Sequence, residues 1–134
     1  MEITIDFPGG ARVDAHFRGH DLPTDQPVRD GGEDSAPMPF DLFLASIATC
    51  VGYYVLKFCQ QRDLPTEDIR ITQNHHPNRE TGLMGKINIE IQVPASFPKQ
   101  YHSALIRSAE LCKVKKSLEN PPQLEITTKE VDTG

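Results

Sequence analysis

The feature that most constrains the fold is a long apolar segment at residues 39–62. Pro39 suits a first helical turn, where a missing N–H costs nothing, and Leu64 followed by Pro65 marks the end of the predicted helix. Its apolar positions lie nearly all round the helix: Leu42, Phe43, Leu44, Ile47, Val51, Tyr54, Val55 and Phe58. A helix without a polar face has to be buried on several sides. We therefore expect a central helix that other elements cover.

The segments on either side of this helix alternate between apolar and polar residues in the way strands do. The pattern predicts strands on both sides of a turn at residues 8–10, a short strand near 26–29, a hairpin of 69–73 with 87–93, and a last strand at 124–128. From about Pro98 to Asn120 the period is helical. Strands, a long helix, a hairpin, a helix and a strand indicate an α+β fold with a mainly antiparallel sheet.

The 134 residues predict a single domain spanning 1–134, long enough to bury a core without disulfides. The net charge is only −5, and the one dense basic run is Lys113, Lys115 and Lys116. A run this short is typical of a solvated helix face, so we expect no nucleic-acid partner. The longest uncharged apolar stretch, residues 42–56, is shorter than the roughly 20 residues that span a bilayer. We therefore expect no membrane partner.

The cysteines point to a reducing compartment. The chain has three of them, and its first residues show no basic segment followed by an apolar one, so no signal peptide is predicted. An odd number of cysteines in that context argues against a secreted disulfide framework. We expect a cytoplasmic protein whose thiols are reduced. Each thiol is then either an inert packing group or a reactive group.

The sequence gives different reasons to interpret each of the three cysteines, Cys50, Cys59 and Cys112, as structural or reactive. A free cysteine is most often a buried small hydrophobe, and this reading applies to all three. Cys59 follows Cys50 by nine positions, so a regular helix points the two in opposite directions, and we interpret Cys59 as structural. Three lysines follow Cys112 closely, and nearby cations lower the pKa of a thiol.

Other chemistry finds little support in the chain. His75 and His76 are predicted at a hairpin tip, where adjacent histidines are usually solvated, and no Cys or His partner lies at metal-finger spacing. The glycines at 9 and 10 lack the lysine and helix of a phosphate-binding loop. We therefore expect neither a metal nor a cofactor.

Two motifs resemble those of the OsmC/Ohr family. Residues 37–50 read PMPFDLFLASIATC, which is similar to the family's long-helix motif leading to a reactive cysteine. Residues 112–118, CKVKKSL, are similar to its second cysteine motif. The resemblance covers nearly the whole chain, including the order of elements. It implies an OsmC-like fold, with a sheet packed on a long central helix, and an intertwined homodimer in which the long helices of both subunits pack at the centre.

The resemblance also implies an activity, the thiol-dependent reduction of hydroperoxides, organic ones especially, in defence against oxidative stress. Cys50 would attack the peroxide as a thiolate and become a sulfenic acid, and Cys112 would condense with it to a disulfide. An external dithiol would reset the pair.

Members of the family that perform this chemistry use an arginine to hold the thiolate and a carboxylate to orient that arginine. Arg12 is the first choice for the arginine, ahead of Arg18 and Arg29. Asp41 is the candidate carboxylate. It faces away from Cys50 on its own helix, so it would serve the partner's cysteine across a two-fold axis, or else only favour the helix N-terminus. Phe40 stands where the family's peroxidases carry glutamate.

Two other functions remain open from the sequence. The chain can be a redox-sensing or small hydrophobic ligand-binding protein with little peroxidase turnover, or a structural dimer with inert thiols. Phe40 favours the sensing or binding reading, whereas the paired cysteine motifs favour the enzyme.

Overall fold

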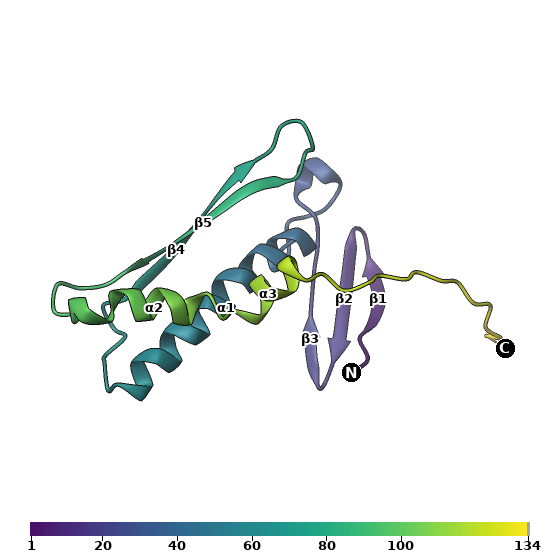
Figure 1. The fold of residues 1–134 in the computed structure, drawn as a ribbon. Coiled ribbons are helices and arrows are strands. Elements are labelled where there is room, and N and C mark those ends of the chain that lie inside the picture. The colour runs from purple at the N-terminus through teal and green to yellow at the C-terminus, as the bar shows by residue number, and fades with distance from the viewer. Residues whose placement is uncertain (134) are drawn as a thin grey trace.

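A computed structural model describes residues 1–133 (Figure 1). Its order of elements confirms the predicted α+β class. In chain order they are β1 (Thr4–Gly9), β2 (Arg12–Phe17), β3 (His20–Leu22), the 3₁₀ helix η1 (Val28–Asp30), α1 (Pro39–Gln61), β4 (Arg70–Pro77), β5 (Met84–Gln92), the 3₁₀ helix η2 (Lys99–Tyr101), α2 (His102–Ala109) and α3 (Lys113–Glu119).

The long helix α1 lies at the centre of the structure, but one chain covers only part of its apolar surface: Phe40, Phe43, Tyr53 and Leu56 stay 38–53% exposed. Helices α2 and α3 and strand β4 contact it (Figure 1). Its buried residues are Leu44, Ile47, Val51, Val55, Phe58 and Cys59. At 23 residues α1 is long and apolar enough to cross a membrane by length and composition, a test that the core helix of a soluble protein also passes. The helix is longer than its uncharged stretch because it continues through Lys57 to Gln61.

Strands β4 and β5 form the predicted antiparallel hairpin, in register from Arg70 opposite Gln92 to His76 opposite Lys86. On β5 the isoleucines at 87, 89 and 91 are half-buried and alternate with exposed polar residues, which confirms the half-buried strand. The position predicted for His75 and His76 is wrong, because both lie within β4 and the turn begins after Pro77. Pairing with β5 extends the strand despite its polar sequence.

Strands β1, β2 and β3 make a separate antiparallel sheet beside the N-terminal end of α1 (Figure 1). The turn predicted at residues 8–10 lies slightly later, at residues 10–11, because Pro8 and Gly9 belong to β1 and Gly9 pairs with Arg12. The short strand expected near residues 26–29 is wrong, since η1 lies there and the third strand is β3. Pro27 has no N–H for a strand ladder and instead begins the 3₁₀ turn.

The single helix predicted from Pro98 to Asn120 is interrupted. It divides into η2, α2 and α3, and residues 110–112 separate the last two helices. Cys112 is the N-cap of α3, in an extended conformation with φ −46° and ψ 121°. The break turns the chain so that α3 returns alongside α1 (Figure 1).

The last strand, predicted at 124–128, does not form within one chain. Residues 121–133 have no helix or strand, and they extend away from the rest of the fold (Figure 1). Leu124 is 85% exposed and Ile126 is 93% exposed. A strand needs a neighbour for its N–H and C=O groups, and none of the strands described within the chain pairs with this segment.

The loop between β3 and α1 is organised by a buried carboxylate, Asp25, which is 1% exposed. Its oxygens accept hydrogen bonds from the Gln26 N–H, the Glu33 N–H, and both the N–H and the hydroxyl of Ser35. Its own N–H donates to the Pro37 carbonyl, two residues before α1. These bonds tie the N-terminal sheet to the start of the central helix.

We predict that Asp25→Asn destabilises the protein and makes its stability less dependent on pH in acid. The hydroxyl of Ser35 and the surrounding N–H groups outweigh burial and lower the pKa of Asp25 from its ordinary 3.8 to about 2. The folded protein therefore binds fewer protons here than the unfolded chain, and this stabilisation is present above pH 3.8 and is lost as pH falls toward 2. Above pH 3.8 the native protein should melt at a higher temperature than the variant, and this difference should shrink as the pH falls toward 2. A difference in melting temperature that does not change with pH would contradict this role.

Candidate redox site

Cys50 and Cys112 come together from segments more than 60 residues apart in the sequence. Cys50 is in the middle of α1, and Cys112 is in the bend between α2 and α3. The two thiols lie close enough for each to shift the pKa of the other, since Cys112 lowers that of Cys50 and Cys50 raises that of Cys112. Cys50 is partly exposed and Cys112 is fully buried. The two residues chosen from the sequence therefore form one site.

The first turn of α3 supplies the hydrogen-bond donors of this site. The first N–H groups of any helix lack partners within the helix. Here the N–H groups of Lys113 and Val114 donate to the Cys50 sulfur. The N–H of Lys115 donates to the Cys112 sulfur over 3.4 Å. Two sulfur atoms thus take the place of the usual hydroxyl or carboxylate cap.

This environment favours a thiolate at Cys50. Burial alone opposes ionisation, but the hydrogen bonds from the N–H of Val114, the thiol of Cys112 and the N–H of Lys113 together lower the pKa of Cys50 below its ordinary value. Hydrogen bonds directed at the charged form are one of the physical causes that lower a pKa. Cys50 is therefore the more acidic thiol of the pair.

The pKa of Cys112 shifts in the other direction. Burial raises it most, the Lys115 N–H lowers it by less, and the neighbouring Cys50 raises it further. The lowering that the neighbouring lysines predicted is therefore wrong. The ammonium of Lys115 pairs with Glu119 at 2.5 Å, whereas its backbone N–H bonds the Cys112 sulfur.

Cys59 takes no part in this arrangement. It is fully buried in the main core cluster, and burial raises its pKa. This agrees with the structural reading drawn from its nine-residue spacing to Cys50.

Asp41 and Arg12, the proposed supporting residues, are not brought to the cysteine pair within one chain. Asp41 is exposed in the first turn of α1, about 13 Å along the helix from Cys50. Arg12 lies on β2, where its guanidinium bonds the Asp14 carboxylate at 3.0 Å. Neither is among the groups that shift the pKa of Cys50. Within one chain the backbone of α3 takes the place expected for the arginine.

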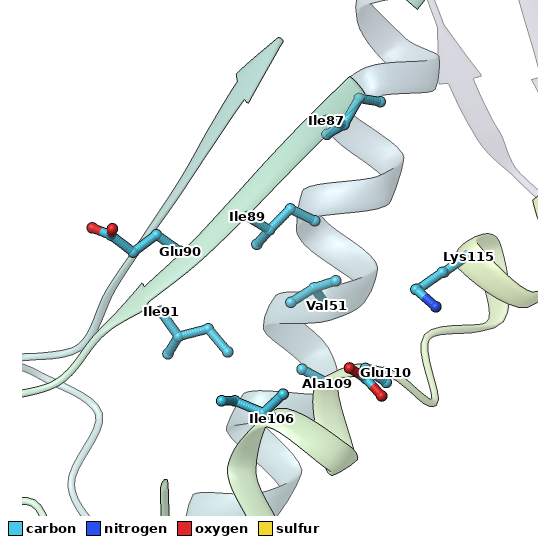
Figure 2. Close-up of a pocket in the computed structure, with 9 residues that line it drawn as sticks. All are labelled: Val51, Ile87, Ile89, Glu90, Ile91, Ile106, Ala109, Glu110 and Lys115. Carbon is cyan, nitrogen blue, oxygen red and sulfur yellow. The ribbon is translucent and has the colours of Figure 1, made fainter. Parts of the chain in front are cut away.

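A largely apolar groove of about 470 Å³ lies between β5, α1 and α2 (Figure 2). The isoleucine side chains of β5 point into it, whereas Glu90 points away from α1. Val51, the residue after Cys50, forms part of its wall, and Lys115 and Glu110 are at its edge. The remaining lining residues are Ile87, Ile89, Glu90, Ile91, Ile106 and Ala109. The groove suits an organic group carrying few polar atoms.

Metal ligands do not cluster in residues 1–133, since no group of three or more His, Cys, Asp or Glu side chains is placed to hold an ion.

The sequence did not reveal the N–H donors of Lys113, Val114 and Lys115. Neither Pro nor Gly marks the interruption at residues 110–112, and the spacing of Ala109 and Cys112 continues a helical period. The one available signal is that Cys112 directly precedes a second short run of helix formers, as an N-cap residue does.

Comparison with known proteins agrees with this architecture. Residues 32–127 match the family model of OsmC-like proteins, which covers both cysteines. The chain belongs to the OsmC-like family. No curated protein sequence matches it.

Solved structures share the fold at low sequence identity. A protein of Psychrobacter arcticus, named for osmotic stress induction and a detoxification response, superimposes with a TM-score of 0.72 at 20% identity, over 86% of this chain and 85% of that one. An OsmC-like protein of Mycoplasma pneumoniae gives 0.69 at 13% identity, over 90% and 87%. The organic hydroperoxide resistance protein OhrB of Bacillus subtilis gives 0.53 at 18% identity, over 90% and 93%. These similarities establish the fold.

We predict that Lys113→Pro slows alkylation of Cys50 by iodoacetamide at neutral pH by roughly fivefold, the effect of losing one hydrogen bond of about 1 kcal/mol. Proline removes the N–H that donates to Cys50, and it is tolerated at the first position of a helix. The extended ψ of 121° at Cys112 also suits a residue before proline.

Lys113→Ala is the matched control, because it removes the same side chain and keeps the N–H. The pH midpoint of the alkylation rate should rise in the proline variant and stay near the native value in the alanine variant. Equal midpoints in the two variants would contradict the role of this backbone donor.

Proposed function

We propose that this protein is a thiol peroxidase that reduces organic hydroperoxides and so protects against oxidative stress. The observation that carries the proposal is the pairing of Cys50 on α1 with Cys112 at the start of α3, two thiols whose pKa values shift in opposite directions. This division of roles is what a peroxide-attacking cysteine and a resolving cysteine require.

The proposed cycle has three steps. The Cys50 thiolate attacks the terminal oxygen of the hydroperoxide, and the O–O bond breaks. The alkoxide leaves and is protonated to the alcohol. The Cys112 sulfur then attacks the resulting sulfenic acid, a disulfide forms, and hydroxide leaves with the proton of Cys112 as water. An external dithiol reduces the disulfide by exchange.

The groove beside the pair supports an organic substrate. Its walls are isoleucine, valine and alanine side chains, which would receive the hydrocarbon part of a hydroperoxide next to Cys50. Related folds include the organic hydroperoxide resistance proteins of Bacillus subtilis and Elizabethkingia anophelis.

We also propose that the protein works as an intertwined homodimer. Apolar side chains are left exposed at both ends of the chain, with Ile5 at 52% and Phe7 at 79% on β1, and Leu124 and Ile126 in the C-terminal segment. The outer edge of β1 has no neighbouring strand. A second copy would cover these surfaces and give the C-terminal segment the strand partner that its alternating sequence predicts.

The dimer is also the setting in which the supporting residues would act. Asp41 and Arg12 lie apart from Cys50 in one chain, so a role for either in activating the thiolate requires residues of the second copy. A cytoplasmic location would keep the pair reduced between turnovers.

A second candidate is a redox sensor or small hydrophobic ligand-binding protein with little turnover. The absence of Arg12 and Asp41 from the site of one chain favours it, as does the apolar groove. Steady-state kinetics separate the two candidates, because a sensor would form its disulfide once and would not consume peroxide continuously in the presence of a dithiol.

Serine variants test the peroxidase cycle. Cys50→Ser should abolish consumption of cumene hydroperoxide in the presence of dihydrolipoamide, because no thiolate remains to attack the peroxide. Cys112→Ser should retain a single turnover that leaves a sulfenic acid, trapped by dimedone, on Cys50. Cys59→Ala is the control and should turn over like the native protein. Native-like turnover by Cys50→Ser would contradict the proposal.

A charged substitution tests the homodimer. Ile126→Glu should shift the protein from dimer to monomer in sedimentation experiments, because it places a carboxylate in the proposed sheet. Glu125→Lys, on the opposite face of the same segment, is the matched control and should leave the dimer intact. A native protein that sediments as a monomer would contradict the arrangement.

A further inference from the structure

Helix α3 depends on the two sulfurs for its hold on the rest of the protein. It has seven residues, too few for stability in isolation, and none of them is fully buried. Val114 is half-buried against the core. The ion pair between Lys115 and Glu119 is exposed at both ends and contributes little. What remains is its first turn, whose N–H groups are bonded to sulfur.

Formation of a Cys50–Cys112 disulfide changes every hydrogen bond between the first turn of α3 and the two sulfurs. The thiolate charge on Cys50 disappears, and a neutral disulfide sulfur is a far weaker acceptor for the N–H groups of Lys113 and Val114. The Cys112 sulfur also has to approach from hydrogen-bond distance to a bond of about 2.05 Å. That movement takes it out of the position in which it accepts from the Lys115 N–H.

We propose that the cysteine pair is a redox-controlled cap for α3: the reduced pair caps the helix, and oxidation releases its first turn. Because α3 leads directly into residues 120–133, release of the helix adds residues of α3 to the extended C-terminal segment that carries the exposed Leu124 and Ile126. The oxidation state of the pair is thereby converted into a change of conformation at the end of the chain. The inference rests on the disulfide of the proposed function and is independent of catalytic turnover.

Hydrogen exchange followed by mass spectrometry tests the proposal on the full chain. Diamide takes two electrons and two protons from the thiols, so it forms the disulfide without peroxide chemistry. Amides of residues 113–119 should exchange roughly fivefold faster or more after oxidation, the effect of losing one cap. Amides of the β4–β5 hairpin should be unchanged. Peptide mapping of the same sample identifies the disulfide.

Two variants separate the cap from other effects of oxidation. Cys112→Ala should speed exchange in α3 even under reducing conditions, because it removes the capping sulfur. Cys112→Ser should keep α3 protected and insensitive to diamide, because a serine hydroxyl caps well and cannot form the disulfide.

A mapped Cys50–Cys112 disulfide with unchanged exchange in α3 would contradict the redox-controlled cap, but it would be compatible with the proposed peroxidase cycle. Absence of that disulfide after diamide treatment would contradict both the redox-controlled cap and the resolving step. Unchanged protection in Cys112→Ala would show that sulfur capping does not hold the helix, and would also overturn the inference.

Discussion

Everything else in this fold depends on burying α1, a helix that is apolar nearly all round. Burial of large aliphatic and aromatic side chains stabilises a fold by roughly 1.5–3 kcal/mol each, and α1 places Val51, Val55 and Phe58 in the main core cluster. The hairpin β4–β5 and helices α2 and α3 pack around it because no single element can cover so wide an apolar surface. Cys50 is fixed in the middle of this helix, so the reactive thiol sits on the most constrained element of the chain.

The position of Cys112 follows from the way the chain turns back onto α1. The bend after α2 places the first turn of α3 over Cys50, and the unpaired N–H groups of that turn find sulfur as their acceptor. One local feature thus ends a helix, caps the next one and lowers the pKa of a thiol. The same bonds make α3 sensitive to what happens to the two sulfurs.

The sequence was sufficient for the parts of the fold in which a strong pattern coincides with local geometry. Pro39 marks the start of α1, and the isoleucine alternation identifies β5. It was insufficient where backbone geometry decides the outcome, as at the bend before Cys112, where no glycine or proline signals an interruption. The C-terminal segment shows a third case, since its strand pattern is clear but no strand described within the chain pairs with it. The site was predicted as two side chains, but half of it consists of backbone N–H groups, which every residue except proline carries and which no motif displays.

The most direct test of the account is a titration of the reduced protein with cumene hydroperoxide, with free thiols counted and disulfides mapped by mass. The account predicts that about one equivalent of peroxide removes two thiols rapidly, that the bond formed joins Cys50 to Cys112, and that Cys59 stays reduced. Three thiols that survive an excess of peroxide for many minutes would contradict a reactive pair at this site.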